Sequence, residues 1–442
     1  MQALTRFTVR HCYGLGLLFR LLLLAFAAWQ DVSLPIRYTD VDYDVFTGAA
    51  ALAARGGSPY EQPGYRYPPM IAWLLLPGAW LGIPWLWGRL LFVLFDFLCA
   101  QGIGSLALLG GAPAATARAC QALFLLSPFS AVLSTRGSMD SLACFATLQT
   151  LIFATLLAAP AGAKLGWRSA ALGVALGAAV HLRLYPVIYT APCALLLGNN
   201  TRSALIFLLS AGCTFVALTG ASVAAHGWDA VGQAYLYHGS RVDAAHSFSP
   251  LWVHIHASLE AGGGGGWAVA APWSLLAALA LGAALWRDPP LCFFLQTLAF
   301  VSLNRVVTAQ YFNWWGVFLP VLAPRCTLSA RAMVALGGAW LLAYLHWLAW
   351  AYQLEHAGRP VHWQLGTAAW LFFSANAALG GSAWLYRRDA TAEERRAAAQ
   401  YAELSFSLFK EHEAPGGGSG GGRNREFAAF SRAVAARREK QH

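Results

Sequence analysis

The sequence predicts an all-α polytopic membrane protein with about twelve transmembrane helices and further re-entrant or interfacial helices. Hydrophobic residues make up 58% of the 442 residues and charged residues only 11%, whereas a soluble domain carries roughly a quarter charged residues. Apolar stretches of about twenty residues, long enough to cross a bilayer, recur along the chain. The membrane is therefore the first predicted partner.

The excess of basic residues does not indicate a nucleic-acid partner. Of the 30 Lys and Arg residues behind the net charge of +10, eleven lie from Arg387 onward, so the tail is basic and the rest sparsely charged. This distribution is typical of positive-inside anchoring. The eight Cys residues lie in or near apolar stretches without paired spacing, so neither a disulfide framework nor a zinc site is predicted.

The transmembrane segments follow from hydropathy. The predicted spans are residues 13–31, 88–109, 118–133, 139–159, 168–183, 187–198, 203–225, 267–286, 290–304, 311–323, 330–352 and 363–386. The first is long enough to span, so we expect it to be retained rather than cleaved as a signal peptide. The segment Pro68–Ile83 contains only about fourteen apolar residues, so we expect a re-entrant or interfacial helix there.

The basic residues between these segments predict the sidedness. With a cytosolic N-terminus, the positive-inside rule is satisfied along the chain. The basic residues then on the cytosolic side are Arg118, Lys164, Arg168, Arg202, Arg287, Arg325, Arg331, Arg387 and Arg388. Both termini are predicted to be cytosolic, and loops 32–87 and 226–266 lie on the opposite side.

Five arginines violate this rule, because they lie at or near the non-cytosolic surface. They are Arg66, Arg136, Arg183, Arg241 and Arg305. One interpretation is that some of them pair with Asp96, Asp140 or Asp243 and hold helices together. The other is that five such charges together bind an anionic ligand.

Two regions follow from the change in composition. Residues 1–386 form a transmembrane domain whose loops carry the candidate site. Residues 387–442 form a basic cytosolic tail with a Gly-rich linker at 416–422. We expect this tail to be dispensable for chemistry.

The densest group of acids in the transmembrane domain follows its first span. Asp40, Asp42 and Asp44 lie within five residues. In a structural interpretation, Thr39 caps a helix from about Asp40 to Arg55, with the acids in its first turn. In a functional interpretation, a carboxylate of this group acts as a general base.

Further polar clusters are predicted on the same side of the membrane. They are Arg66 and Tyr67; Arg136 and Asp140; His181, Arg183 and Tyr185; His238, Arg241 and His246; and Gln310. We expect these side chains to bind substrate beside the acids. Asp96 lies inside the second span, where it is either an interhelical partner or an acceptor contact.

Several motifs resemble one family in their order and spacing. They read Tyr-Thr-Asp-Val-Asp-Tyr at 38–43, Gly-Ser-Pro-Tyr at 57–60, Tyr-Arg-Tyr at 65–67, Ser-Thr-Arg-Gly at 134–137, His-Leu-Arg-Leu-Tyr-Pro at 181–186, Phe-Ser-Pro at 248–250 and Gln-Tyr-Phe at 310–312. The chain resembles the catalytic subunit of GPI mannosyltransferase I, in the GT-C class of polyprenyl-phosphate-dependent glycosyltransferases. Members typically have Lys where this chain has Arg183, and the basic tail is outside their pattern.

The resemblance implies a GT-C fold and an enzyme of the endoplasmic reticulum membrane with a lumenal active site. It implies transfer of the first, α1,4-linked mannose from dolichyl-phosphate mannose to the glucosamine of glucosaminyl-(acyl)phosphatidylinositol, a GPI precursor lipid. The family's Asp-x-Asp corresponds to Asp40 and Asp42. A small single-span lumenal accessory subunit is the implied partner.

The chemistry of that reaction assigns roles to the clusters. A β-linked donor and an α-linked product imply one inverting displacement, for which one carboxylate suffices as base. Alternate residues lie about 200° apart on a helix, so we expect Asp40 as the base and Asp42 as an orienting or acceptor-binding group. The groups expected to stabilise the leaving phosphate are Arg136, His181, Arg183 and Arg241. Because the donor has a single phosphate, we expect no obligatory metal or other cofactor.

Two other functions remain open at this point. Another polyprenyl-phosphate-sugar transferase would have the same architecture with a different acceptor. A lipid or sugar transporter is less favoured. Transporters usually have paired half-repeats with broken helices and midplane sites, whereas no such repeats are evident in this sequence and its polar clusters lie at one surface.

Overall fold

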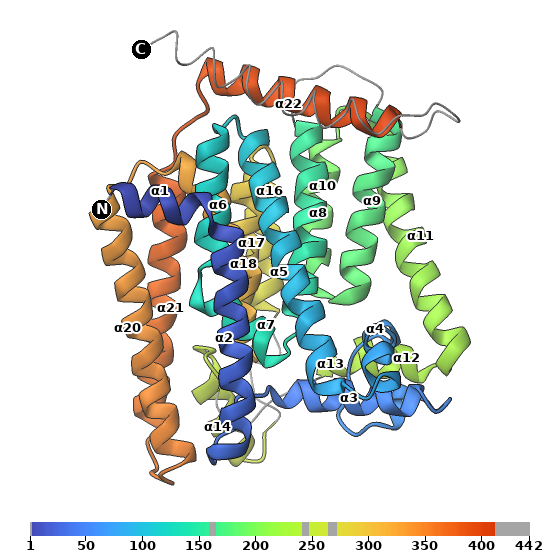
Figure 1. Ribbon diagram of the computed structural model, residues 1–442, viewed down its shortest axis with the longest axis vertical. Helices are drawn as coiled ribbons and strands as arrows, with labels where there is room; N and C mark the ends of the chain where they lie inside the picture. Colours follow the sequence, from blue (N-terminus) through green and yellow to red (C-terminus); the bar gives the residue numbers. More distant parts are fainter. Residues whose placement is uncertain (1, 159–164, 241–246, 264–271, 412–442) are drawn as a thin grey trace.

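The protein is a bundle of helices that stand side by side along one axis (Figure 1). The computed structural model describes residues 2–158, 165–240, 247–263 and 272–411. Within these ranges the chain forms helices and turns, with one isolated antiparallel bridge between Cys326 and Arg387. The predicted all-α polytopic fold class is confirmed.

The helices of the bundle are α2 (Cys12–Ser33), α5 (Pro84–Leu109), α6 (Ala114–Leu125), α7 (Pro128–Arg136), α8 (Asp140–Ala158), α9 (Leu165–Leu182), α10 (Thr190–Leu196), α11 (Thr201–His226), α16 (Trp273–Leu285), α17 (Pro289–Ser302), α18 (Phe312–Gly316), α19 (Leu319–Leu322), α20 (Ala330–Glu355) and α21 (His362–Leu385). The remaining helices are α1 (Gln2–Arg10), α3 (Val41–Ala53), α4 (Pro69–Trp80), α12 (Asp229–Val231), α13 (Tyr237–Ser240), α14 (Trp252–Glu260) and α22 (Ala392–Glu411). Short turns of other helix types are η1 (Pro59–Glu61), η2 (Tyr185–Tyr189), η3 (Gly232–Leu236), η4 (Ala309–Tyr311) and η5 (Ala323–Arg325).

The count of twelve spans is not confirmed. Within the described ranges, five helices are long and apolar enough to cross a membrane, namely α2, α5, α8, α11 and α20. A sixth span results if α6 and α7, which meet at a 52° bend, are counted together. Other predicted spans coincide with shorter helices, such as α16 with 13 residues and α17 with 14. Hydropathy identifies apolar segments but does not take account of the proline residues and turns that shorten the helices within them.

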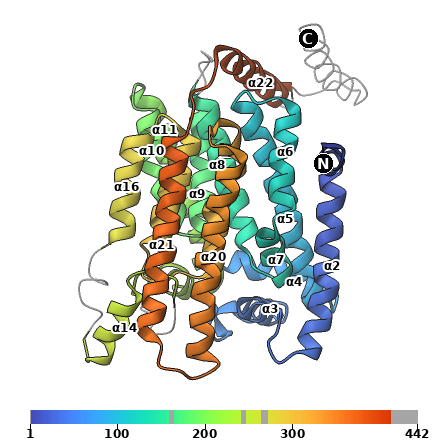
Figure 2. The ribbon, with the colours of Figure 1, turned by 90° about the vertical axis from the view of Figure 1, so that its left-hand side faces the viewer.

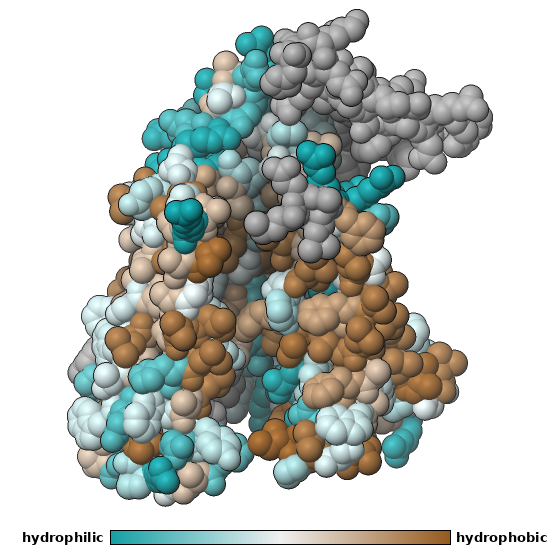
Figure 3. All heavy atoms as spheres, turned by 60° about the vertical axis from the view of Figure 1, so that its left-hand side comes forward, coloured by the Kyte–Doolittle hydropathy of each residue, from teal (hydrophilic) through white to brown (hydrophobic). Residues whose placement is uncertain are grey.

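The two ends of the bundle differ. Helix α3 lies across one end, here called the α3 end, and α22 lies across the other, the α22 end (Figures 1 and 2). Apolar side chains gather between the ends on the face drawn in Figure 3, where a hollow separates two lobes. The predicted re-entrant segment forms α4, whose 12 residues extend about 18 Å at 1.5 Å per residue and cannot span a bilayer.

Part of the predicted tail packs against the bundle. Arg388 binds Glu394 at 2.7 Å, and its backbone N–H donates to the carbonyl of Arg325 at 2.9 Å. Farther along α22, Ala402 packs against Leu109 and Leu156. The predicted Gly-rich linker at 416–422 lies outside the described residues.

A buried ion pair joins α2 to the rest of the bundle. Arg20 Nε donates to Asp96 at 2.8 Å, and the Ser141 hydroxyl donates to the other carboxylate oxygen at 2.6 Å. Both charged side chains are fully buried. Arg20 also donates to the carbonyl of Leu125 at 2.7 Å. The open question about Asp96 is therefore answered: it is an interhelical partner.

Replacing Asp96 by Leu is expected to destabilise the protein by about 3–5 kcal/mol, because Arg20 is left buried without its counter-ion. Thermal unfolding in detergent micelles measures this loss. The double variant Arg20→Met/Asp96→Leu is the control, and it should recover most of the stability because no unpaired charge remains. Unfolding of Asp96→Leu at the wild-type temperature would show that the pair does not stabilise the bundle.

Candidate active site

Asp40 begins the helix that lies across the α3 end. Its backbone is extended (φ −66°, ψ 138°), and its carboxylate accepts the N–H of Asp42 at 3.1 Å as the N-cap of α3. The prediction that Thr39 caps this helix is wrong. The Thr39 hydroxyl instead donates to Asp31 and accepts from Arg89, so the next residue takes the capping position.

Asp31, at the end of α2, holds the segment that leads to Asp40. Its carboxylate accepts the backbone N–H groups of Tyr38 at 2.7 Å and Thr39 at 3.0 Å. The buried guanidinium of Arg89 lies 3.7 Å from the same carboxylate and 3.9 Å from the centre of the Trp85 ring. Sequence reasoning missed both residues. The sequence feature that could have indicated them is an acidic residue near the end of one apolar helix and a basic residue near the start of the next, on either side of the first loop.

The start of α3 is also fixed against the end of α7. The N–H of Asp40 donates to the carbonyl of Arg136 at 3.0 Å. Gly137 follows with φ at +94° and ends α7 in the left-handed conformation. The Tyr43 ring lies against this glycine, where a Cβ atom would overlap it. The Tyr43 hydroxyl donates to the carbonyl of Pro84 at 2.7 Å.

Replacing Gly137 by Ala is expected to lower both stability and catalysis. A left-handed Ala costs about 1–2 kcal/mol, and displacing Tyr43 costs about 1–3 kcal/mol more and shifts the turn that holds Asp40. Gly56→Ala is the matched control, since φ there is +83° and a Cβ meets nothing within 4 Å. Unfolding temperature and kcat should fall further in Gly137→Ala than in Gly56→Ala, and equal losses would contradict the packing argument.

The surroundings of Asp40 favour a proton acceptor. Burial raises the pKa of the Asp40 carboxyl, the negative charge of Asp42 raises it further, and Arg136 opposes both effects. A general base works best when its pKa lies near the operating pH, so a raised pKa favours Asp40 in this role. In the described part of the chain, the amide of Asp42 is the hydrogen-bond donor found on this carboxylate. Arg136 Nε is buried and has no hydrogen-bond partner there.

Asp42 is engaged differently. Its carboxylate accepts the Tyr67 hydroxyl at 2.7 Å, and burial raises the pKa of this phenol well above its ordinary value, so it remains a donor. The guanidinium of Arg183 lies 5.1 Å from the centre of the Tyr67 ring. Asp44 points elsewhere and binds Arg37 at 2.7 Å on the surface. The three acids therefore have three different environments.

Arg183 is held by the buried carboxylate of Asp140. Arg183 Nη2 donates to Asp140 at 3.0 Å, and Trp314 Nε1 donates to the same oxygen at 2.8 Å. The hydroxyl of Ser138 donates to the second oxygen at 2.7 Å. Arg183 Nε is buried without a hydrogen-bond partner in the described ranges, so one donor of this guanidinium is unused.

An aromatic stack supports this arrangement. Trp314 lies between Tyr185 and Tyr311, with both ring centroids 4.1 Å away. The Tyr185 hydroxyl is 3.1 Å from that of Thr147. Trp314 is absent from the predicted site residues, although it belongs to the aromatic cluster that follows Gln310. The sequence showed the cluster but not which of its rings faces the site.

A cavity of about 380 Å³ lies beside these residues. Six predicted residues line it: Arg66, Tyr67, His181, Arg183, Tyr185 and His238. Tyr235, Arg305 and Trp314 line it as well. Asp40 and Asp42 do not line it, but Tyr67 both lines the cavity and binds Asp42.

Other predicted residues bind one another in the wall. Arg66 donates to Gln233, and its guanidinium lies 4.5 Å from the centre of the Tyr237 ring. His238 Nε2 is 3.1 Å from the carbonyl of Arg66. His181 Nδ1 is 2.8 Å from the Tyr235 hydroxyl, a contact that was not predicted from the sequence.

Some predictions remain without a structural counterpart. Arg241 and His246 lie outside the described residues. Gln310 lies in η4, beside Tyr311. Among the residues that the structure describes, no group of three or more His, Cys, Asp or Glu side chains is arranged to hold a metal ion. Whether the reaction needs a metal stays a prediction.

Comparisons with known proteins identify the family. A family model described as "Mannosyltransferase (PIG-M)" matches residues 133–381, and one described as "GPI transamidase subunit PIG-U" matches residues 16–244. The GPI alpha-1,4-mannosyltransferase I catalytic subunit of Danio rerio is 36% identical over 82% of this chain and 93% of its own length. GPI mannosyltransferase 1 of Saccharomyces cerevisiae is 33% identical over 83% of this chain and 93% of its own length. A solved structure, ArnT from Cupriavidus metallidurans bound to undecaprenyl phosphate, matches with a TM-score of 0.41 and 18% identity, over 82% of this chain and 71% of that chain.

The helical bundle and these relatives define a polytopic membrane glycosyltransferase that transfers mannose in GPI-anchor synthesis. The chain belongs to the family of GPI mannosyltransferase I catalytic subunits. The resemblance inferred from the motifs is confirmed.

Proposed function

We propose that this protein transfers the first mannose from dolichyl-phosphate mannose to the glucosamine of glucosaminyl-phosphatidylinositol, in an α1,4 linkage and with inversion. One observation carries the proposal: Tyr67 connects the carboxylate of Asp42 to a cavity whose wall contains Arg183 with an unused donor. An acid group and a phosphate-binding group thus lie on two sides of one residue. The name of the Danio rerio relative, GPI alpha-1,4-mannosyltransferase I catalytic subunit, supports the linkage.

The reaction needs one base and one anion-binding group. Asp40 accepts the proton of the acceptor hydroxyl as that oxygen attacks the anomeric carbon from the face opposite the phosphate. Its raised pKa suits it to this role, as does the presence of one hydrogen-bond donor on it, the Asp42 amide, among the described residues. Asp42, bound to Tyr67, orients the acceptor.

The departing lipid phosphate needs stabilisation of its negative charge rather than a proton. Arg183 provides this charge, because Asp140 and Trp314 hold its guanidinium in place and Nε is available. A preorganised guanidinium costs no reorganisation when the charge develops. Arg136 lies beside Asp40, its carbonyl accepting the Asp40 N–H, and provides a second positive charge near the reacting groups.

The proposal includes a location and a partner. We place the enzyme in the endoplasmic reticulum membrane, with the α3 end in the lumen and both termini in the cytosol. The basic residues near the α22 end support this orientation through the positive-inside rule. A small single-span lumenal subunit is the proposed partner, and no obligatory metal is proposed.

An assay in microsomes tests the proposal. Dolichyl-phosphate mannose and glucosaminyl-phosphatidylinositol are supplied to membranes that contain the wild type, Asp40→Ala or Asp42→Ala. We expect the wild type to form the mannosylated lipid with α1,4 linkage and both variants to lose most of the activity. Retained transfer in both variants would refute the catalytic assignment, and transfer only to a different acceptor lipid would refute the proposed substrate.

A further inference from the structure

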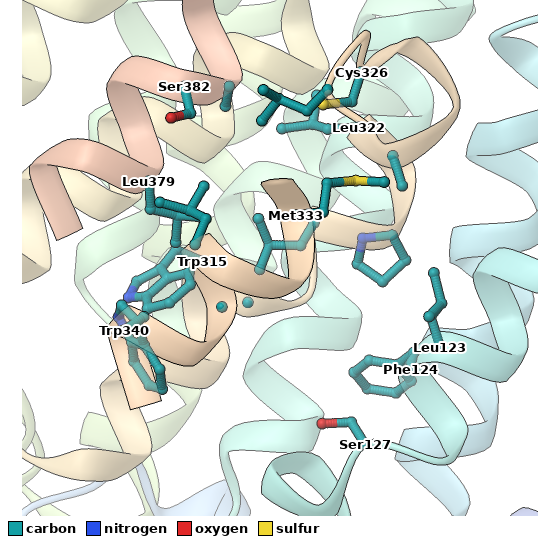
Figure 4. Close-up of a pocket in the computed structure, with 18 of the residues that line it drawn as sticks. Leu123, Phe124, Ser127, Trp315, Leu322, Cys326, Met333, Trp340, Leu379 and Ser382 are labelled. Atoms are coloured by element: carbon teal, nitrogen blue, oxygen red, sulfur yellow. The ribbon is translucent and has the colours of Figure 1, made fainter. Parts of the chain in front are cut away.

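A second cavity, of about 420 Å³, lies between α6, α18, α19, α20 and α21, apart from the candidate active site. Trp315 and Trp340 lie at one of its ends and Leu322, Cys326 and Ser382 at the other, with Met333 between them (Figure 4). Leu123 and Phe124 of α6 form the wall opposite Leu379 of α21. Nearly all of these side chains are apolar, so the cavity suits a hydrocarbon chain.

The charged residues of this cavity lie at one rim, near the α22 end. Arg325 binds Asp288 through two hydrogen bonds, of 2.8 and 2.7 Å. Its Nε is buried and has no hydrogen-bond partner among the described residues. Arg387 donates to the carbonyl of Trp384 at 3.1 Å, and no acid of the described ranges pairs with it. Two guanidinium groups and one carboxylate line this rim, and the carboxylate of Asp389 also lies near Arg325.

We propose that this cavity binds one acyl chain of an anionic phospholipid from the surrounding membrane, with the lipid phosphate against Arg325 and Arg387. An apolar cavity between membrane helices excludes water and accepts hydrocarbon. Guanidinium groups bind phosphate oxygens through charge-assisted hydrogen bonds, and cations at the membrane surface attract anionic lipids. The cavity and its rim thus match the two parts of one molecule.

Occupancy also bears on the active site, because both cavities share α18. Trp314 lines the cavity beside Arg183, whereas Phe312 and Trp315 line the second cavity. An acyl chain packed against Phe312 and Trp315 fills the space behind α18, the helix whose Trp314 donates to Asp140. The lipid is therefore a structural ligand that supports the position of Trp314.

Two adjacent glycines provide a matched test. Gly337 lines the cavity and Gly338 does not, and a Cβ atom at either position meets nothing within 4 Å. Leu at either position favours the helix over Gly, so both variants should fold. Gly337→Leu places a side chain in the cavity, whereas Gly338→Leu adds the same side chain outside it.

The probe is a nanodisc with equal amounts of phosphatidylserine and phosphatidylcholine, from which the full-length protein is released for native mass spectrometry. We expect the wild type and Gly338→Leu to retain phosphatidylserine preferentially. Gly337→Leu should retain about tenfold less lipid, because its side chain competes for the space. Arg387→Gln should lose the preference for phosphatidylserine and still bind lipid.

Two results would overturn the proposal. Equal lipid retention in Gly337→Leu and Gly338→Leu would show that the retained lipid binds elsewhere. A raised KM for the polyprenyl donor in Gly337→Leu, with unchanged phosphatidylserine retention, would assign the cavity to the donor chain instead. The unfolding temperature of each variant is measured alongside, so that a misfolded sample is recognised before its lipid content is compared.

Discussion

Replacing Asp40 by Asn is expected to lower kcat for mannosyl transfer by about 10²–10⁴-fold, the contribution typical of a general base. Asn keeps the size of the side chain and still accepts the N–H of Asp42, so α3 retains its cap. The loss should therefore appear in catalysis and not in the unfolding temperature. Initial rates at saturating acceptor, with thermal unfolding in parallel, measure both.

The matched control is Asp44→Asn on the same helix. Asp44 binds Arg37 on the surface, where both side chains are 52% exposed, and exposed pairs contribute little to stability. Its activity should equal that of the wild type. Asp42→Asn should lie between the two, because its neutral amide oxygen accepts the Tyr67 hydroxyl more weakly than the carboxylate does, while Asp40 remains as the base. Full activity in Asp40→Asn would assign the base elsewhere.

The pH dependence of kcat separates the two acids further. A base works only when ionised, so the rate falls as pH drops through its pKa. Because the charge of Asp42 raises the pKa of Asp40, Asp42→Asn should move the acid limb of the profile to lower pH. Arg136 lowers that pKa, so Arg136→Gln should move the limb to higher pH. Shifts in the same direction for both variants would contradict Asp40 as the titrating group.

The convergence of the polar clusters was predictable from the sequence. Hydropathy placed each cluster beside a helix end, and the basic residues assigned those ends to one side of the membrane. Arg66, Tyr67, His181, Arg183 and Tyr185 therefore line one cavity, as expected. Their spacing along the chain showed no pairing, however. Arg183 and Asp140 are 43 residues apart and meet at 3.0 Å only because α8 and α9 are neighbours.

The parts that were not predictable depend on packing. The N-cap of α3 is Asp40 rather than Thr39 because Asp31 and Arg89, from two other helices, bind the Thr39 hydroxyl. Local sequence rules do not include such distant partners. Trp314 is a similar case. Only its stacking with Tyr185 and Tyr311 shows that Trp314, and not the adjacent Trp315, faces the site.

Replacing Arg183 by Gln is expected to lower kcat by about 10²–10³-fold, the effect of removing one preorganised donor to a developing negative charge. Gln cannot pair with the charge of Asp140, which keeps its hydrogen bonds from Trp314 and Ser138. Some loss of stability should accompany the loss of rate, so thermal unfolding must be measured as well. Arg37→Gln is the control for removing an arginine near the α3 end, and it should leave the rate unchanged.

Arg183→Lys distinguishes charge from geometry. Lys retains the positive charge beside Asp140 but lacks the planar fork of the guanidinium. If the phosphate needs charge alone, Arg183→Lys should keep kcat within about tenfold of the wild type. If the fork is required, because Nη2 binds Asp140 while Nε binds the phosphate, Arg183→Lys should lose as much rate as Arg183→Gln. We expect the first result. Trp314 and Ser138 hold Asp140 in place without help from residue 183. The ammonium group of Lys can therefore pair with this one carboxylate and still lie toward the phosphate. A wild-type rate in Arg183→Gln would remove Arg183 from the reaction.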